Sequence, residues 1–306
     1  MLNKSSRYSI KDIEHLSNVK SHTIRIWEQR YKLLSPERTN TNIRFYDDEQ
    51  LKKLLNVSTL LNSGMKISHI SKLTDEEITK KLDTILKSST VSIGKKEALL
   101  TSAIIAVLAY DEKSFEKLFN NSIADHGLIT TYINVLYPLL VRTGQMWASN
   151  SMLPAQEHFL SNILERKLHA AIDLLPLPKT DAETWLLFLT EGEEHELGLL
   201  IAHYILRKNR KHVIYLGRRL PLNNLYDVIR KCQPSNLYTF FIRNRPEYEL
   251  NELLSEITLT FKKLNIFISG RKEIVETIKF NNRVSKIIDV KELIALINKD
   301  RQEQHD

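Results

Sequence analysis

The sequence predicts a multidomain fold in which a winged helix-turn-helix head, a four-helix bundle and an α/β domain follow one another. The spacing of apolar residues changes along the chain, from short helical stripes to four longer helical runs and then to alternating strands and helices. Two breaks separate these segments, a polar stretch over 74–95 and a proline-containing stretch over 176–181. We place the domains at residues 1–75, 92–176 and 183–301.

The composition excludes disordered and membrane-spanning proteins. Hydrophobic residues make up 42% of the 306-residue chain and charged residues 26%, both ordinary values for a globular protein. No stretch reaches the roughly 18 apolar residues that a membrane helix needs, and the first residues hold no apolar signal core. The one cysteine, Cys232, excludes an internal disulfide framework and a cysteine-based zinc site. We expect a cytoplasmic protein with no membrane partner.

Positive charge is concentrated near the N-terminus. The chain has a net charge of +7, and residues 1–75 hold 13 basic and 8 acidic side chains. A local basic excess favours a polyanion such as nucleic acid as the partner, and a solvated surface is the alternative.

The first segment has the layout of two short helices followed by a hairpin. Ser9 can cap a helix with an apolar stripe through Ile10, Ile13 and Leu16. The break 18–21 separates it from a second helix over 22–31, as in a helix-turn-helix. Residues 36–46 suit a hairpin, and a third helix follows from 47 to 60, with a glycine at 64 to end it.

Three stretches of this segment carry a family resemblance: Thr-Ile-Arg-Ile-Trp-Glu-Gln-Arg-Tyr over 23–31, Leu-Leu-Ser-Pro-Glu-Arg over 33–38, and Arg-Phe-Tyr over 44–46. The segment resembles the winged-helix DNA-binding domain of the MerR family. The resemblance implies a double-stranded DNA operator as partner, with the second helix in the major groove and the wing on phosphate. The residues that it places at the DNA are Thr23, Arg25, Arg30, Arg38, Arg44 and Tyr46. The alternative for each arginine is a surface ion pair with Glu28, Glu37 or Asp47.

The second segment predicts a four-helix bundle from apolar runs near 98–108, 115–119, 129–140 and 159–172. One feature stands apart from core packing: Trp147 is followed, after nine residues, by Glu157 and His158, near a bend at Pro154. The alternative interpretation is a packed tryptophan beside a surface Glu–His pair.

The third segment alternates strands and helices, which predicts a mostly parallel sheet with right-handed crossovers. We expect strands at 185–190, 213–216, 237–242, 266–269 and 286–290, and helices at 197–207, 224–231, 248–262, 273–279 and near 293–298. Ligands of such sheets bind beyond the carboxyl ends of the strands. The loop after the first strand, residues 190–198, is therefore the place for a site.

That loop contains Glu193-x-His195-x-x-Gly198, which resembles the acid-x-His-x-x-Gly signature of cobalamin-binding, flavodoxin-like (Rossmann-like) α/β domains. A neutral imidazole is a good ligand for a transition metal, and a carboxylate can hold its other nitrogen. The resemblance implies that His195 binds cobalt, that Glu193 orients it and that Gly198 lets the helix backbone lie close to the corrin or its nucleotide tail. A solvated loop histidine is the alternative.

The expected tail pocket departs from this pattern. Cobalamin domains carry a small hydroxyl residue at the end of the third strand, and the nearest one here, Thr239, is out of register by one. Ser269 and Gly270 stand where a Gly-Gly pair is expected, and we place both in the cofactor site. The resemblance gives no role to Phe240, Phe241, Arg243 and Arg245.

Taken together, the three segments resemble the light-responsive, adenosylcobalamin-binding transcriptional repressors of the CarH/LitR group. The resemblance implies that Trp147 and Glu157 surround the upper adenosyl group, and that His158 takes the upper cobalt position after light breaks the cobalt–carbon bond. It also implies a homo-oligomer in the dark, a tetramer of two head-to-tail dimers, that dissociates on illumination.

Two alternatives stay open. The first is a MerR-type regulator that has lost cobalamin binding and responds to a protein partner or another ligand. The second is a cobalamin-dependent methyl-transfer enzyme, which needs a separate substrate domain for which no stretch of the chain remains. We therefore expect no enzyme and no catalytic residues.

Overall fold

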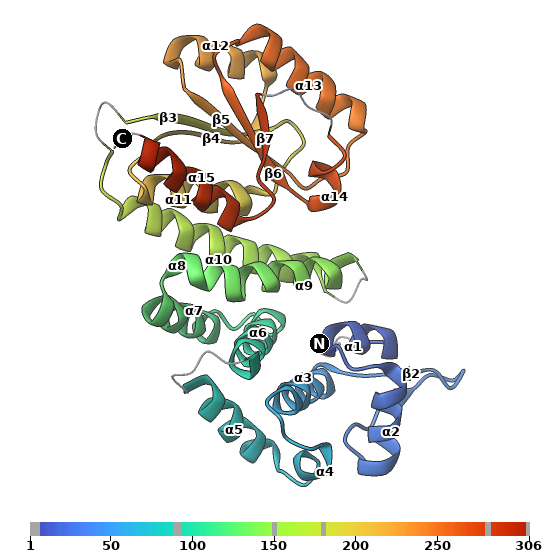
Figure 1. Ribbon diagram of the computed structural model, residues 1–306. Coiled ribbons are helices and arrows are strands. Elements are labelled where there is room, and N and C mark those ends of the chain that lie inside the picture. Colours follow the sequence, from blue (N-terminus) through green and yellow to red (C-terminus); the bar gives the residue numbers. More distant parts are fainter. Residues whose placement is uncertain (1–6, 88–92, 149–151, 179–181, 279–282, 304–306) are drawn as a thin grey trace. The chain divides into compact units, whose positions relative to one another are not determined.

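The computed structural model describes residues 7–87, 93–148, 152–178, 182–278 and 283–303 (Figure 1). By its internal contacts the chain divides into an N-terminal unit, Met1–Leu160, and a C-terminal unit, Ser161–Asp306. No helix among the described residues is long and apolar enough to cross a membrane. The domain boundaries stay predictions, and parts of both predicted breaks, 88–92 and 179–181, lie outside the described residues.

The head of the N-terminal unit has the expected order of elements: α1 (Ile10–Ser17), α2 (Ser21–Tyr31), the antiparallel pair β1 (Glu37–Arg38) and β2 (Arg44–Phe45), and α3 (Asp48–Asn62). Ser9 caps α1 in a reciprocal capping box with Asp12. Asn18 ends α1 with a φ of 55°, a left-handed conformation that asparagine tolerates. The local sequence signals therefore set the boundaries of the head.

The rest of the N-terminal unit is helical. It contains α4 (Ile67–Ile70), α5 (Asp75–Lys87), α6 (Ile93–Leu108), α7 (Glu112–His126), α8 (Leu128–Thr131) and α9 (Tyr137–Ala148). A π-helical turn, η1 (Tyr132–Leu136), joins α8 to α9, so the third predicted helix is a continuous helical path with one widened turn. Helix α10 (Pro154–Asp173) starts at Pro154, where the missing N–H of proline costs no hydrogen bond.

The C-terminal unit is built on a parallel sheet of five strands in the order β4-β3-β5-β6-β7. The strands are β3 (Thr184–Thr190), β4 (His212–Leu220), β5 (Asn236–Phe241), β6 (Asn265–Gly270) and β7 (Val284–Lys286). The helices that alternate with them are α11 (Glu196–Lys208), α12 (Leu222–Cys232), α13 (Glu247–Thr260), α14 (Lys272–Val275) and α15 (Val290–Glu303). This strand order is the flavodoxin-like one, with its switch point between β3 and β5.

Two strand predictions were partly wrong. Strand β4 runs on to Leu220 because it continues past an irregularity at Gly217, whose φ is +70°, where the prediction stopped. The last strand ends at Lys286 rather than starting there, because Asp289 accepts hydrogen bonds from the amides of Lys291 and Glu292 and begins α15. The helix expected over 273–279 is the short α14, and residue 279 lies outside the described residues.

The two faces of the sheet carry different side chains. Leu237 and Phe241 of β5 belong to the core under α12, α13 and α14, together with residues of β3 and β6. Because side chains alternate along a strand, Tyr238 and Phe240 point to the opposite face, which α11 covers (Figure 1). Gly198, the cofactor residue expected on α11, therefore meets Phe240 and not Thr239.

Candidate functional site

Helix α2 exposes basic side chains on its outer surface. Ile24 and Trp27 are buried against the rest of the head, which turns Arg25 and Arg30 outward, while Thr23 is half-buried. The guanidinium carbon of Arg30 lies 5.5 Å from the ring centroid of Tyr31, close enough for a cation–π contact. An exposed cationic face on the second helix of a helix-turn-helix is the arrangement that major-groove binding requires.

The wing, which is the hairpin formed by β1 and β2, adds a further exposed arginine. Arg38 lies on β1, and its Nη1 donates a hydrogen bond of 2.6 Å to Oδ1 of Asn42, at the turn of the hairpin. Asn42 has a φ of 66°. The partner is neutral, so the wing presents the full charge of Arg38 to solvent.

The other two expected DNA contacts are held by an acid of α2. Glu28 accepts hydrogen bonds from Nε of Arg44 at 3.1 Å and from the hydroxyl of Tyr46 at 2.5 Å. The side chain of Tyr46 is 0% exposed, and burial, followed by its bond to Glu28, raises the pKa of the phenol. The expectation of a direct DNA contact by Tyr46 does not agree with this placement. Tyr46 and Glu28 instead brace β2 against α2.

In the helical region, Trp147 lies near the end of α9, while Glu157 and His158 lie in the first turn of α10. Nδ1 of His158 lies 3.4 Å from Oε2 of Glu157. The side chain of Trp147 is 56% exposed, so a tightly packed tryptophan does not describe this residue. A large exposed aromatic surface is available for a ligand or partner.

The loop after β3 positions an acid and an imidazole. Glu193 is 0% exposed, and its Oε1 lies 2.5 Å from Nδ1 of His195. The backbone amides of Ile242 and Arg243 each donate to Oε2 of Glu193 at 2.9 Å, and those of Glu194 and His195 donate to Oε1. The carboxylate thus ties the β3–α11 loop to the end of β5.

This environment keeps Glu193 ionised. Burial alone raises the pKa of a carboxyl group, but the bonds from His195 and from the amides of Arg243 and Ile242 outweigh it and lower the pKa to about 2. A carboxylate beside Nδ1 accepts a hydrogen bond from the N–H there, which leaves the lone pair on Nε2 of His195. The side chain of His195 is 56% exposed. Glu193 and His195 therefore fit a site in which His195 would supply an imidazole ligand to the metal of a corrin.

The space beside Gly198 does not fit the expected tail pocket. A Cβ atom placed on Gly198 would lie 2.3 Å from Cζ of Phe240, so the ring of Phe240 lies directly on the backbone of α11. We expected Gly198 to admit the corrin or its tail, and here it admits a side chain of this chain. The hydroxyl of Thr239 is buried on the other face of the sheet, as the register predicts.

Ser269 and Gly270 end strand β6. Ser269 pairs with Phe240 in the sheet register and is 6% exposed. Gly270 has a φ of 142°, and a Cβ there would lie 1.9 Å from the carbonyl oxygen of Phe241. The glycine is therefore required by the backbone alone, whatever the site holds.

The structure gives roles to residues that the sequence left without one. Phe241 is part of the core under α12 and α13, and the amide of Arg243 holds Glu193. The guanidinium groups of Arg243 and Arg245 donate to the carbonyls of Gly192 and Glu191, respectively. Sequence analysis missed these bonds because about 50 residues of chain separate the partners.

The C-terminal unit also contains an ionic network that sequence analysis did not single out. Arg218 of β4 binds Glu196 of α11, and its Nη2 lies 2.6 Å from Oε2 of Glu165 on α10. The hydroxyl of Tyr215 donates to Glu196 at 2.9 Å. The network fixes the first turn of α11, directly after His195.

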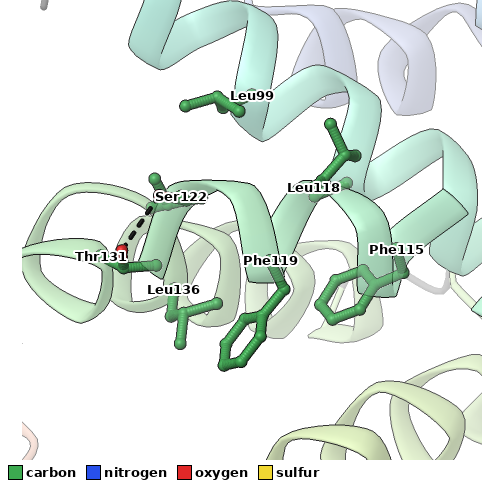
Figure 2. Close-up of a pocket in the computed structure, with 9 residues that line it drawn as sticks. Leu99, Phe115, Leu118, Phe119, Ser122, Thr131 and Leu136 are labelled. Atoms are coloured by element: carbon green, nitrogen blue, oxygen red, sulfur yellow. Dashed lines mark hydrogen bonds between the residues drawn. The ribbon is translucent and has the colours of Figure 1, made fainter. Parts of the chain in front are cut away.

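A small apolar pocket lies in the N-terminal unit, at α6, α7 and the α8–η1 segment (Figure 2). Its volume is about 10 Å³, roughly what one water molecule needs. The hydroxyls of Ser122 and Thr131 lie 3.0 Å apart at its edge. It is lined by Leu99, Ala103, Phe115, Leu118, Phe119, Ser122, Thr131, Val135 and Leu136. An organic cofactor does not fit this pocket.

Comparisons with known proteins match two regions of the chain to family models. Residues 8–77 match the model of the MerR HTH family regulatory proteins, and residues 99–172 match the model of the B12 binding domain. The HTH-type transcriptional repressor CarH of Myxococcus xanthus is 27% identical, over 86% of this chain and 88% of its own length. CarA of the same organism, also named an HTH-type transcriptional repressor, is 23% identical over 97% of this chain and 98% of its own length.

Among solved structures, the monomethylamine corrinoid protein of Methanosarcina barkeri superposes with a TM-score of 0.53. It is 13% identical and covers 64% of this chain and 94% of its own, a likeness that supports the fold. The chain is therefore a multidomain DNA-binding regulator that combines a MerR helix-turn-helix with a B12-binding domain. More narrowly, it is a transcriptional regulator of the CarH and CarA type. These relatives are regulators, in agreement with the expectation that the chain is not an enzyme.

Proposed function

We propose that this chain is a cytoplasmic repressor whose binding to an operator is controlled by adenosylcobalamin and light. The observation that carries the proposal is the pair Glu193–His195, in which a buried carboxylate held by four backbone amides directs an imidazole for metal binding. Adenosylcobalamin, when bound, supplies a cobalt–carbon bond that light breaks.

The chain's own residues divide the work as follows. His195, the residue directly before α11, would hold the cobalt, and Glu193 orients its imidazole through Nδ1. In the helical region, Trp147 and Glu157 would hold the adenosyl group in the dark, and His158 would supply an imidazole ligand to the metal after illumination. The exposure of Trp147 and His158 supports this assignment because neither side chain is packed into the core.

We propose that ligand binding acts on DNA through assembly. A regulator that switches must exist in two states, and the ligand shifts the balance only as far as it binds them differently. The dark, loaded chain is a homo-oligomer, a dimer or tetramer, that binds double-stranded DNA, and illumination dissociates it.

For the DNA contacts we propose that Thr23, Arg25 and Arg30 of α2 face the major groove, while Arg38 binds phosphate from the wing. Arg44 takes part through its remaining N–H groups, and Tyr46 positions it through Glu28. A wing phosphate contact is the expected role of an exposed arginine with a neutral partner.

Replacing Arg25 with alanine is expected to weaken operator binding about tenfold and to lower the slope of log K against log salt by about 1. The operator is first selected from random duplex DNA, and binding is then titrated at several salt concentrations. Lys231→Ala, which removes a charge from α12 in the C-terminal unit, is the control and leaves the slope unchanged. Unchanged binding in both Arg25→Ala and Arg38→Ala would place the contact surface elsewhere.

The central experiment is to purify the protein with adenosylcobalamin in the dark and to record absorbance and size-exclusion profiles before and after illumination. We expect a bound corrin spectrum, and an assembly that becomes smaller in light. His195→Ala is expected to weaken cofactor retention by at least about 10- to 100-fold, since the loss of a residue that only orients a metal ligand has about that cost. His212→Ala, at the start of β4 on the opposite edge of the sheet, is the matched histidine control.

One observation favours the second candidate, a regulator that no longer uses cobalamin: the ring of Phe240 lies where the tail of the cofactor is expected. If the dark-purified protein holds no corrin and its assembly ignores light, this alternative replaces the photoreceptor proposal. The DNA-binding assignment does not depend on that outcome.

A further inference from the structure

The strongest unexplained feature of the C-terminal unit is the filled space between α11 and the sheet. Three ring carbons of Phe240, Cζ, Cε1 and Cε2, lie 2.3, 2.4 and 2.7 Å from the position of a Cβ on Gly198. Real Cβ atoms do not approach other atoms so closely, so the ring uses the volume that the glycine leaves open. No second group fits between the two without moving Phe240.

Further aromatic side chains fill the same face of the sheet. Trp185 of β3 and Phe267 of β6 are stacked, with ring centroids 4.8 Å apart. Between these strands, Tyr238 of β5 is 3% exposed and lies beside Ser269. These residues share the parity of Phe240 along paired strands and so point to the α11 side. These four aromatic side chains form a ring layer between α11 and the sheet. The layer fills that space from the middle of the strands to their carboxyl ends.

Phe240 differs from the other aromatic residues of the layer because it is only partly buried. It ends the layer at the carboxyl edge, the same edge at which β3 leads into the loop with His195. A partly exposed ring at this edge blocks access from solvent to the space between α11 and the sheet. The imidazole of His195, in contrast, is more than half exposed and is not covered by the ring layer.

We propose that Phe240 excludes the nucleotide tail of a corrinoid from the α/β interior, so that His195 holds the metal while the tail stays outside. Corrinoids with a small lower group or none are then bound about as tightly as cobalamin, because the tail adds little to affinity. This inference rests on the proposed function, because it concerns the same corrinoid site. It also accounts for the departure of this chain from the tail motif at Thr239 and Ser269.

The test compares two pure ligands, cobalamin and cobinamide, the latter a corrinoid that lacks the nucleotide tail. Absorbance titrations in the dark give the dissociation constant of each with the wild-type protein and with Phe240→Ala. We expect the wild type to bind the two within a factor of about three. Phe240→Ala is expected to bind cobalamin about tenfold more tightly and cobinamide as before, since a difference of a few atoms in a fitted site changes binding by about this factor or more.

Two controls separate exclusion from a general loss of packing. Phe261→Ala removes another half-buried ring, on the opposite face of the sheet, and is expected to change neither dissociation constant. Phe240→Leu keeps an apolar side chain and serves as the test if Phe240→Ala does not fold. We expect it to bind cobalamin more tightly than the wild type does, by a smaller factor than Phe240→Ala. Thermal unfolding of each variant establishes that it is folded.

The electron paramagnetic resonance spectrum of bound Co(II) cobinamide tests the metal bond separately. Cobinamide has no axial base of its own, so splitting of the cobalt signal by an axial nitrogen can come only from the protein, and it should vanish in His195→Ala. Cobalamin binding at least tenfold tighter than cobinamide in the wild type, with no gain in Phe240→Ala or Phe240→Leu, would overturn the tail-exclusion inference alone. Failure of both corrinoids to bind, in the wild type and in both variants, would overturn the proposed function with it.

Discussion

Replacing Glu193 with glutamine is expected to destabilise the C-terminal unit by about 3 kcal/mol at neutral pH, an effect set by buried hydrogen bonds to a charged group. The carboxylate accepts bonds from four backbone amides and from Nδ1 of His195. The amide of glutamine has nearly the same volume as the carboxylate. Its NH₂ group, however, takes the place of one carboxylate oxygen and faces N–H donors, from which it cannot accept hydrogen bonds. At least two of these bonds are then lost in a site with 0% exposure.

The same site makes stability depend on pH in a defined direction. The pKa of Glu193 is lowered from 4.5 to about 2 in the folded protein. The carboxylate therefore contributes its full stabilisation at pH values above 4.5, the pKa in the unfolded chain. This stabilisation is lost as the pH falls from about 4.5 to about 2, and a shift of this size corresponds to about 3 kcal/mol. The glutamine variant lacks this titration, so its stability should change less over that pH range.

Urea unfolding of the wild type and of Glu193→Gln at pH 7 and at pH 3 measures both effects. The difference between the two proteins should be large at pH 7 and smaller at pH 3. Glu194→Gln is the control, since this neighbouring acid is 45% exposed and pairs with the exposed Arg219. A variant as stable as the wild type at pH 7 would show that the bonds to Glu193 do not hold the loop.

Replacing Glu28 with alanine is expected to cost the DNA-binding head about 3 kcal/mol and to abolish operator binding, because one member of a largely buried charged cluster is removed. Glu28 is 8% exposed, and its loss leaves the fully buried hydroxyl of Tyr46 without an acceptor. Arg44, at 23% exposure, also loses its ion pair. The wing is then no longer fixed against α2.

A double-mutant cycle with Tyr46→Phe isolates this effect. In the wild-type background the change removes one hydrogen bond and should destabilise the head by about 1 kcal/mol. In the Glu28→Ala background it removes an unsatisfied hydroxyl and should be neutral or stabilising. Glu37→Ala, an exposed acid on the wing, controls for the change of charge. Equal effects of Tyr46→Phe in both backgrounds would contradict the proposed bracing, and thermal unfolding gives the values.

Local signals in the sequence predicted most of the fold. The capping residue Ser9, the helix-ending Asn18 and the apolar stripes act over a few positions, and they define α1 and α2. The orientation of Thr239 toward the other face of the sheet was also predictable, because alternation along a strand is a local rule. Likewise, the end of the first parallel strand marked the loop that holds His195.

What could not be predicted depends on residues far apart in the chain. The amides that hold Glu193 belong to Ile242 and Arg243, about 50 positions later, and no spacing rule relates them. Tyr46 had the position of a DNA contact but lies under Glu28, 18 residues earlier. The contact of Phe240 with Gly198 had a signal that was available, a bulky residue on the strand face that α11 covers, but only once the strand register was known.

The widened turn η1 has a consequence for Trp147. A helix advances by about 100° per residue, so the extra residue of a π turn rotates everything after it about the axis relative to a regular helix. The azimuth of the indole is thus set by Tyr132–Leu136, more than ten positions upstream. Deleting one residue of this turn would point the indole in a different direction around the helix axis while leaving the sequence of α9 unchanged.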